Sequence, residues 1–243
     1  MYAIILCEGE TDAILISYYL INTLGYGYIK RLPNNMPKLD DLSKIVNWYK
    51  DVDGKYIAIC PVGGSAFQDS VIKVMDYNRY ADKEKIFQKM VLVMDNDDES
   101  VSEHIKMIGK YLACRNELSA GVWETFSYVN DFSEEVYGKI ACILQPADEY
   151  GALETFVLQV ICENDIDATE AVNQAKVFVK SFKSKKYLQH RRDRVKANLA
   201  VSLSVMYPSR TFTTINEFLE NMRWNDYQLF QKQFKLFENI NII

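Results

Sequence analysis

Residues 2–12 read YAIILCEGETD, an apolar run followed directly by an acidic cluster. Residues 90–98 read MVLVMDNDD and repeat the pattern, with a second acidic cluster after a second apolar run. Short apolar runs of this kind are typical of strands that are buried on both faces of a parallel sheet. The sequence therefore predicts two buried parallel strands that both end in carboxylates.

These two acidic clusters predict a divalent-cation site. Ligands of parallel α/β sheets gather beyond the carboxyl ends of the strands. Carboxylates brought together there repel one another unless a cation lies between them, and hard cations prefer oxygen ligands. We expect Mg²⁺ or Mn²⁺, bound by Glu8 and Asp12 from the first cluster and by Asp95 and Asp97 from the second. The alternative is that Thr11 caps a helix and that the second cluster is a solvated turn or helix cap.

Composition limits the other classes of protein. The 243 residues are 49% hydrophobic and carry a net charge of −5, which predicts a substantial core and excludes a generally basic nucleic-acid coat. Five cysteines without a C-x-x-C pair indicate buried, reduced thiols in a cytoplasmic protein. Only two histidines are present, so a zinc site or a histidine-based triad has little material. We expect no signal peptide and no membrane span.

The spacing of apolar residues predicts an α/β fold with a helical C-terminal part. Four strands are expected, at about 2–7, 56–61, 89–94 and 138–144. Amphipathic helices are expected between them, over 11–24, 39–50, 65–78 and 99–118, and residues 31–41 are expected to form a loop. From residue 151 onward the apolar spacing is helical throughout, over 151–163, 167–182, 187–206, 213–221 and 225–238. We therefore predict a parallel sheet of about four strands with flanking helices in residues 1–148, and a helical extension packed on it in residues 149–243.

The two acidic motifs resemble those of the Toprim domain. An apolar strand that ends in E-G-x-x-D, followed about ninety residues later by one that ends in D-x-D, is found in topoisomerases, primases and several nucleases of that family. The resemblance covers about residues 1–145, and Thr11-Asp12 is similar to the ending of the motif in OLD-family nucleases. It implies a Toprim-like fold and Mg²⁺- or Mn²⁺-dependent cleavage of DNA or RNA.

The resemblance also implies roles for individual residues. Asp95 and Asp97 would be the main metal ligands, and Glu8 a second ligand or a general base. Asp12 would complete the other metal site with Glu154, which lies in Gly151-Ala152-Leu153-Glu154. The segment from Lys196 to Ala200 resembles the K-x-x-x-A segment of OLD nucleases, whose lysine stabilises the transition state. The alternatives are an ordinary first-turn acid for Glu154 and a surface lysine for Lys196.

Two further segments are candidate phosphate contacts. Gly63 and Gly64 precede a predicted helix, so their amides could hold a phosphate, although a plain strand-to-helix turn explains them too. The most basic stretch contains Lys183, Lys185 and Lys186, followed by Arg191, Arg192, Arg194 and Lys196. These cations could contact a nucleic-acid backbone, or they could simply form a solvated helix face.

Two other functions remain open. A phosphatase of the haloacid dehalogenase kind also places D-x-D after a strand, but Glu99 departs from its pattern and the Glu8 cluster would be unexplained. A non-catalytic module of the same fold could instead bind nucleic acid or a protein. An ATPase or another protein is a candidate partner, and an ATPase partner would suggest a role in phage defence.

Overall fold

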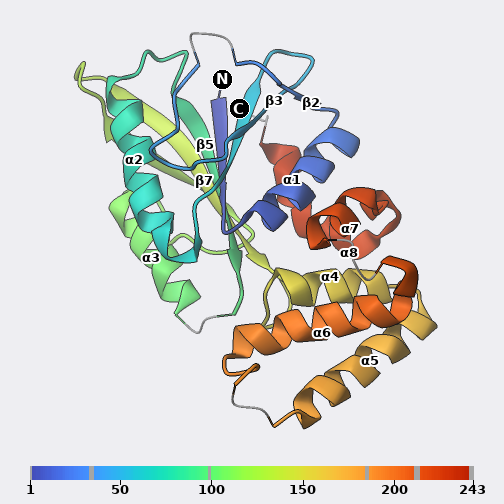
Figure 1. The fold of residues 1–243 in the computed structure, drawn as a ribbon. Helices are drawn as coiled ribbons and strands as arrows, with labels where there is room; N and C mark the ends of the chain where they lie inside the picture. Colours follow the sequence, from blue (N-terminus) through green and yellow to red (C-terminus); the bar gives the residue numbers. More distant parts are fainter. Residues whose placement is uncertain (1, 33–35, 98–99, 184–185, 211–213, 241–243) are drawn as a thin grey trace.

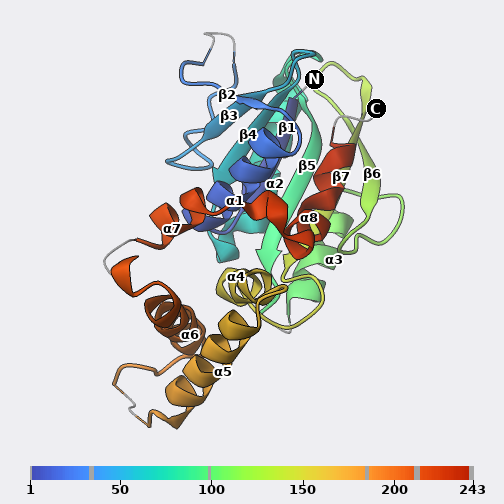
Figure 2. The same cartoon turned by 90° about the vertical axis from the view of Figure 1, so that its right-hand side faces the viewer.

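A computed structural model describes residues 2–32, 36–97, 100–183, 186–210 and 214–240. One seven-stranded sheet forms its centre, in the order β2-β3-β4-β1-β5-β7-β6. Helices cover both faces of the sheet, and a further helical group lies beyond one end of it (Figures 1 and 2). The mixed α/β class that the sequence predicts is therefore confirmed.

The four strands predicted from the apolar runs form the parallel centre of the sheet. They are β1 (Tyr2–Cys7), β4 (Tyr56–Pro61), β5 (Phe87–Asp95) and β7 (Glu135–Gln145). β1 lies between β4 and β5, and β7 lies on the other side of β5. Cys7 is in register with Val93, so the two acidic clusters leave neighbouring strands at the same edge of the sheet.

The prediction of about four strands is too low, because three antiparallel strands extend the sheet. They are β2 (Gly27–Tyr28), β3 (Asn47–Lys50) and β6 (Trp123–Val129). The helix predicted over 39–50 is wrong, since β3 occupies its last four residues. Trp48 and Tyr49 are buried in the cores on opposite faces of the sheet, which is the alternation of a strand.

Two helices cover one face of the sheet and one N-terminal helix covers the other. α2 (Phe67–Tyr80) and α3 (Val101–Tyr111) pack against the first face. α1 (Glu10–Asn22) buries Leu15, Ile16 and Tyr19 against the opposite face. α3 ends seven residues before the predicted limit of 118, at the turn where Ala113 has a φ of 50°.

All described secondary structure after residue 152 is helical, as predicted. It comprises α4 (Leu153–Cys162), α5 (Ile166–Ser181), α6 (Arg191–Met206), α7 (Ile215–Asn221) and α8 (Gln228–Phe234), with short 3₁₀ turns. α7 and α8 pack beside α1 and continue its core, in which Tyr19 contacts Phe230, Phe234 and Phe237. α4, α5 and α6 form the group beyond the end of the sheet (Figure 2).

The five cysteines are free thiols, and Cys7, Cys60 and Cys142 are buried as expected while Cys114 and Cys162 are half-buried. Within the described ranges, no helix has the length and apolar character required to cross a bilayer.

Candidate carboxylate site

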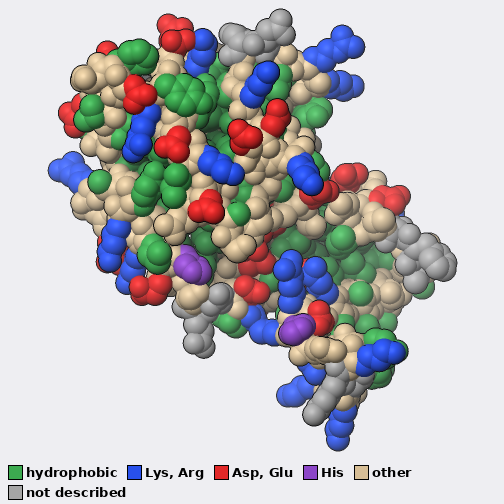
Figure 3. Space-filling view, turned by 60° about the vertical axis from the view of Figure 1, so that its left-hand side comes forward, with side chains coloured by type: hydrophobic (Ala, Val, Ile, Leu, Met, Phe, Trp, Pro, Cys, Tyr) green, Lys and Arg blue, Asp and Glu red, His purple; other side chains and the backbone are tan. Residues whose placement is uncertain are grey.

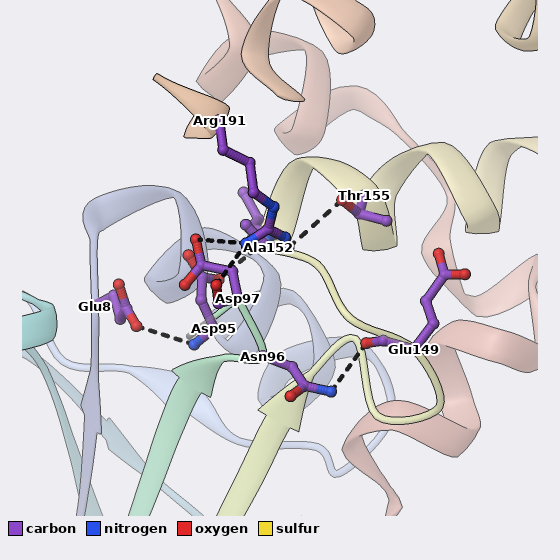
Figure 4. Close-up of polar contacts among 9 residues, drawn as sticks. Glu8, Asp95, Asn96, Asp97, Glu149, Ala152, Thr155 and Arg191 are labelled. Carbon is purple, nitrogen blue, oxygen red and sulfur yellow. Dashed lines mark hydrogen bonds and ion pairs between the residues drawn. The ribbon is translucent and has the colours of Figure 1, made fainter. Parts of the chain in front are cut away.

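A hydrogen bond joins the two acidic clusters. The Glu8 carboxylate follows β1 and accepts, through Oε1, the backbone N–H of Asp95 at the end of β5, at 2.9 Å (Figure 4). The strand register makes this contact possible, because β1 and β5 run in parallel and end side by side. The two clusters therefore lie together at one edge of the sheet, while a metal ion shared by their carboxylates stays a prediction.

Asp95 connects the sheet to the first turn of α4. Its Oδ1 accepts the backbone N–H of Leu153 at 3.0 Å. Burial raises the pKa of Asp95 to about 8, with further contributions from the negative charges of Glu8, Asp12 and Asp97. The Leu153 N–H opposes this rise because it stabilises the ionised form.

Asp12 has a structural contact inside the same cluster. Its Oδ2 accepts the backbone N–H of Gly9 at 2.8 Å, and Gly9, rather than Thr11, is the N-cap of α1. The side chain is only 6% exposed. Burial raises the pKa of Asp12 to about 7, and the charge of Glu8 adds to the rise. Asp12 therefore stabilises the helix start and adds a buried carboxyl group to the site.

Glu8 also has a raised pKa. Burial is the main cause, while the Asp95 N–H and the nearby positive charge of Arg192 lower it. The charges of Asp97 and Glu154 raise it further, and the charge of Glu8 in turn raises the pKa of Asp12 and of Asp95. This mutual repulsion is the electrostatic condition under which a cation is attracted.

Cations from α6 approach the acidic residues. The Arg191 guanidinium donates to the backbone carbonyl of Asp97 and lies 3.9 Å from Asp97 Oδ2 (Figure 4). It also stacks over the Tyr150 ring, 3.9 Å from the ring centroid. Lys196 Nζ lies 3.9 Å from Glu154 Oε1. Sequence segments nearly one hundred residues apart are thus joined at one place.

The other residues of the predicted basic stretch form fewer contacts with the acidic residues. The positive charge of Arg192 lowers the pKa of Glu8. Arg194 forms no ion pair with the acidic residues in the part of the chain that is described. Lys185, Asp98 and Glu99 lie outside the described residues. Figure 3 shows Lys and Arg side chains beside Asp and Glu side chains where the helical group meets the sheet.

The glycine pair borders Glu8. Gly63 has a φ of 87° and donates its N–H to the Glu8 carbonyl at 3.0 Å, so this amide is already used within the fold. A Cβ on Gly64 would lie 2.8 Å from Glu8 Oε2, closer than side-chain carbons normally approach. Gly64 thus leaves room for the Glu8 carboxylate, and phosphate binding by this turn stays a prediction.

The residues present fit a hard divalent cation in donor type. Glu8, Asp12 and Asp95 form no ion pair with lysine or arginine among the described residues. However, no three acidic, histidine or cysteine side chains in the described part of the chain are arranged so that they could hold a metal ion. Binding would therefore require some of these carboxylate side chains to change conformation.

Sequence reasoning missed the residues that hold the two strand ends in place. Asn96, the middle residue of D-x-D, donates through Nδ2 to the carbonyls of Pro146 and Glu149 and accepts the N–H of Gly151. Gln145 is in register with Asp95 and completely buried, and its side-chain oxygen and nitrogen have no hydrogen-bond partner among the described residues. Gln145 follows an apolar run, and no sequence pattern there indicates that its side chain is buried beside the acidic cluster.

The fold and the site define an α/β protein with a carboxylate cluster where the ends of adjacent parallel strands meet a helical group. The chain belongs to the family described as "Protein of unknown function (DUF3226)", whose model matches residues 2–235. It is similar in fold to the crystal structure of hypothetical protein PH0156 from Pyrococcus horikoshii OT3. That similarity has a TM-score of 0.51 at 13% identity and covers 97% of this chain and 99% of the other. No curated protein matches the chain.

Proposed function

We propose that this protein is a Toprim-like enzyme that hydrolyses phosphodiester bonds of nucleic acid with the help of Mg²⁺ or Mn²⁺. The contact between Glu8 and Asp95 carries the proposal, because it joins the E-G-x-x-D and D-x-D motifs at adjacent strand ends. Burial and like charge raise the pKa of both carboxyl groups, as is common at functional sites.

Asp95 and Asp97 are the proposed main metal ligands, with Glu8 as a further ligand or as the general base. Asp12 and Glu154 complete the proposed donor set. When bound, the metal would activate water and offset negative charge on the scissile phosphate. A carboxylate whose pKa is raised accepts a proton more readily, which suits Glu8 to the role of base.

The cations of α6 supply the positive charge of the proposed site. Lys196, positioned beside Glu154, would stabilise negative charge on the phosphate in the transition state. Arg191 lies beside Asp97 and the charge of Arg192 acts on Glu8, and both arginines would contact the phosphate backbone of DNA or RNA. A protein with a net charge of −5 can bind nucleic acid in this way through a local basic patch.

A non-catalytic binding module is the second candidate. It is favoured by one observation, which is that no metal-holding group of side chains is found within the described residues. In that case α6 would still bind nucleic acid, while the carboxylates would hold a structural cation or none.

A cleavage assay distinguishes the two. We expect the wild-type protein to cut DNA or RNA only with Mg²⁺ or Mn²⁺, and the Asp95→Asn and Glu8→Gln variants to lose at least about a hundredfold in rate. Asp131→Asn, at an exposed position in the β6–β7 hairpin, is the matched control and should cut normally. Full cleavage by both site variants would show that any activity is a contaminant.

A further inference from the structure

A cavity of about 340 Å³ opens beside the acidic cluster. It lies between α6 and α7 and reaches the first turns of α1 and α4, through Thr11 and Glu154. Lys196 and Glu154 belong both to this cavity and to the candidate site. Figure 3 shows hydrophobic side chains gathered in the recess between the sheet and the lower helices, next to charged ones.

The walls of the cavity combine apolar and polar groups. Leu199, Leu203 and Phe218 contribute apolar surface, and the Tyr207 ring packs against Phe218 with centroids 5.3 Å apart. Arg210 adds a positive charge at the rim, in addition to Lys196 and Glu154 near the carboxylates. An apolar pocket with a few polar groups at its edge suits a planar molecule that carries hydrogen-bonding groups.

We infer that this cavity receives an unstacked nucleobase of a single-stranded nucleic acid, next to the phosphate that lies at the carboxylate site. The inference rests on the proposed function, since it names the form of the substrate for that same site. The volume lies at the lower end of the range for small-molecule pockets and is large enough for a nucleobase. The cations at two edges would face the phosphates on either side of that base.

This placement has a consequence for substrate choice. A base in a duplex is stacked and paired, so it enters a side pocket only after being flipped out at a free-energy cost. A single strand offers its bases without that cost, and contacts between a base and an aromatic side chain are tolerant of sequence. The protein should therefore prefer single strands, ends or loops to intact duplex.

Binding can be measured separately from cleavage. The Glu8→Gln protein keeps an amide oxygen that can accept the Asp95 N–H, and it should not cut. Its affinity for a short fluorescent single strand, the same strand as a duplex, and the strand with one abasic nucleotide can be compared by fluorescence anisotropy with Mg²⁺ present. DNA and RNA forms of each probe are included.

We expect the single strand to bind about tenfold more tightly than the duplex. The abasic substitution at the most sensitive position should lower the affinity about tenfold. Ala200→Trp, which fills the cavity from an exposed position on α6, should lower the affinity for the single strand by a similar factor. Val205→Trp, on another face of the same helix and outside the cavity, is the control and should bind normally. Thermal melting checks that both variants fold, and the abasic probes test the inference without any cavity variant.

The outcomes separate the inference from the proposed function. Equal affinity for single strand and duplex, unchanged by abasic substitution and by Ala200→Trp, overturns the base pocket even if the wild type cleaves. Selective single-strand binding that depends on the cavity supports it even if the wild type never cleaves, in which case only the nuclease proposal fails.

Discussion

The Glu8 carboxylate accepts the backbone N–H of Asp95 across 87 residues of sequence, and in doing so it fixes the distance between the two acidic motifs. The contact also lowers the pKa of Glu8, against the larger effect of burial. One hydrogen bond thus positions a carboxylate that burial and its neighbours would otherwise favour in the neutral state.

The acidic cluster should make the stability of the protein depend on pH and on divalent cations. The pKa of Asp12 is raised from 3.8 to about 7 and that of Asp95 from 3.8 to about 8, so the folded state binds protons that the unfolded state has released. Stability should therefore fall as the pH rises from about 4 to about 8. Mg²⁺ should reverse the loss near pH 8, because it binds the ionised carboxylates.

Thermal melts between pH 5 and pH 8.5, with Mg²⁺ or with a chelator, would measure this effect. Asp95→Asn should flatten the dependence on pH and weaken the response to Mg²⁺. Melting temperatures that are the same with and without Mg²⁺ at every pH would argue against a cation site at these carboxylates.

Gly64 should be intolerant of even one added carbon atom. In a Gly64→Ala variant the new Cβ would meet Glu8 Oε2 at 2.8 Å, so the carboxylate must move. We expect cleavage to fall by about tenfold or more with little change in melting temperature, since small displacements of reacting groups are costly. Gly27→Ala is the matched control, because its Cβ would have only ordinary contacts, the nearest at 3.7 Å. Equal activity of the two variants would mean that the position of Glu8 is unimportant.

Arg192 should contribute to nucleic-acid affinity mainly through charge. We expect Arg192→Gln to weaken binding several-fold and to reduce the slope of log affinity against log salt concentration by about 1. Titrations at several salt concentrations would measure both effects. Arg223→Gln removes a highly exposed arginine distant in sequence from α6 and should change neither. An unchanged slope for Arg192→Gln would mean that Arg192 does not contact the phosphate backbone of the nucleic acid.

Gln145 should be replaceable by a residue without polar atoms. Its amide is completely buried and has no hydrogen-bond partner among the described residues, so Gln145→Leu should leave stability unchanged or raise it by up to about 1–3 kcal/mol. Gln233→Leu is the contrasting variant, because Gln233 donates to the Leu144 carbonyl and accepts the Ala147 N–H. Urea unfolding would compare them. Marked destabilisation by Gln145→Leu would indicate that a bound molecule near Asp95 uses the amide.

The central strands could be predicted because burial on both faces leaves continuous apolar runs, as in residues 2–7 and 90–94. β3 could not, since Leu42, Ile45, Val46 and Trp48 fit the spacing of an amphipathic helix and only the pairing of residues 47–50 with β4 shows the strand. The meeting of Glu8 with Asp95 followed from the rule that parallel strands end at one edge. The cavity beside Glu154 depends on how α6 packs near α7, which no local pattern records.

The order of synthesis gives the contact between Lys196 and Glu154 a further meaning. A ribosome releases the carboxylates of the first hundred residues long before it releases α6. A nascent chain thus exposes the acids at its strand ends before it has the positive groups of α6 that approach them. If the protein does cut nucleic acid, it would be harmless to the RNA from which it is being translated until nearly the whole chain has emerged.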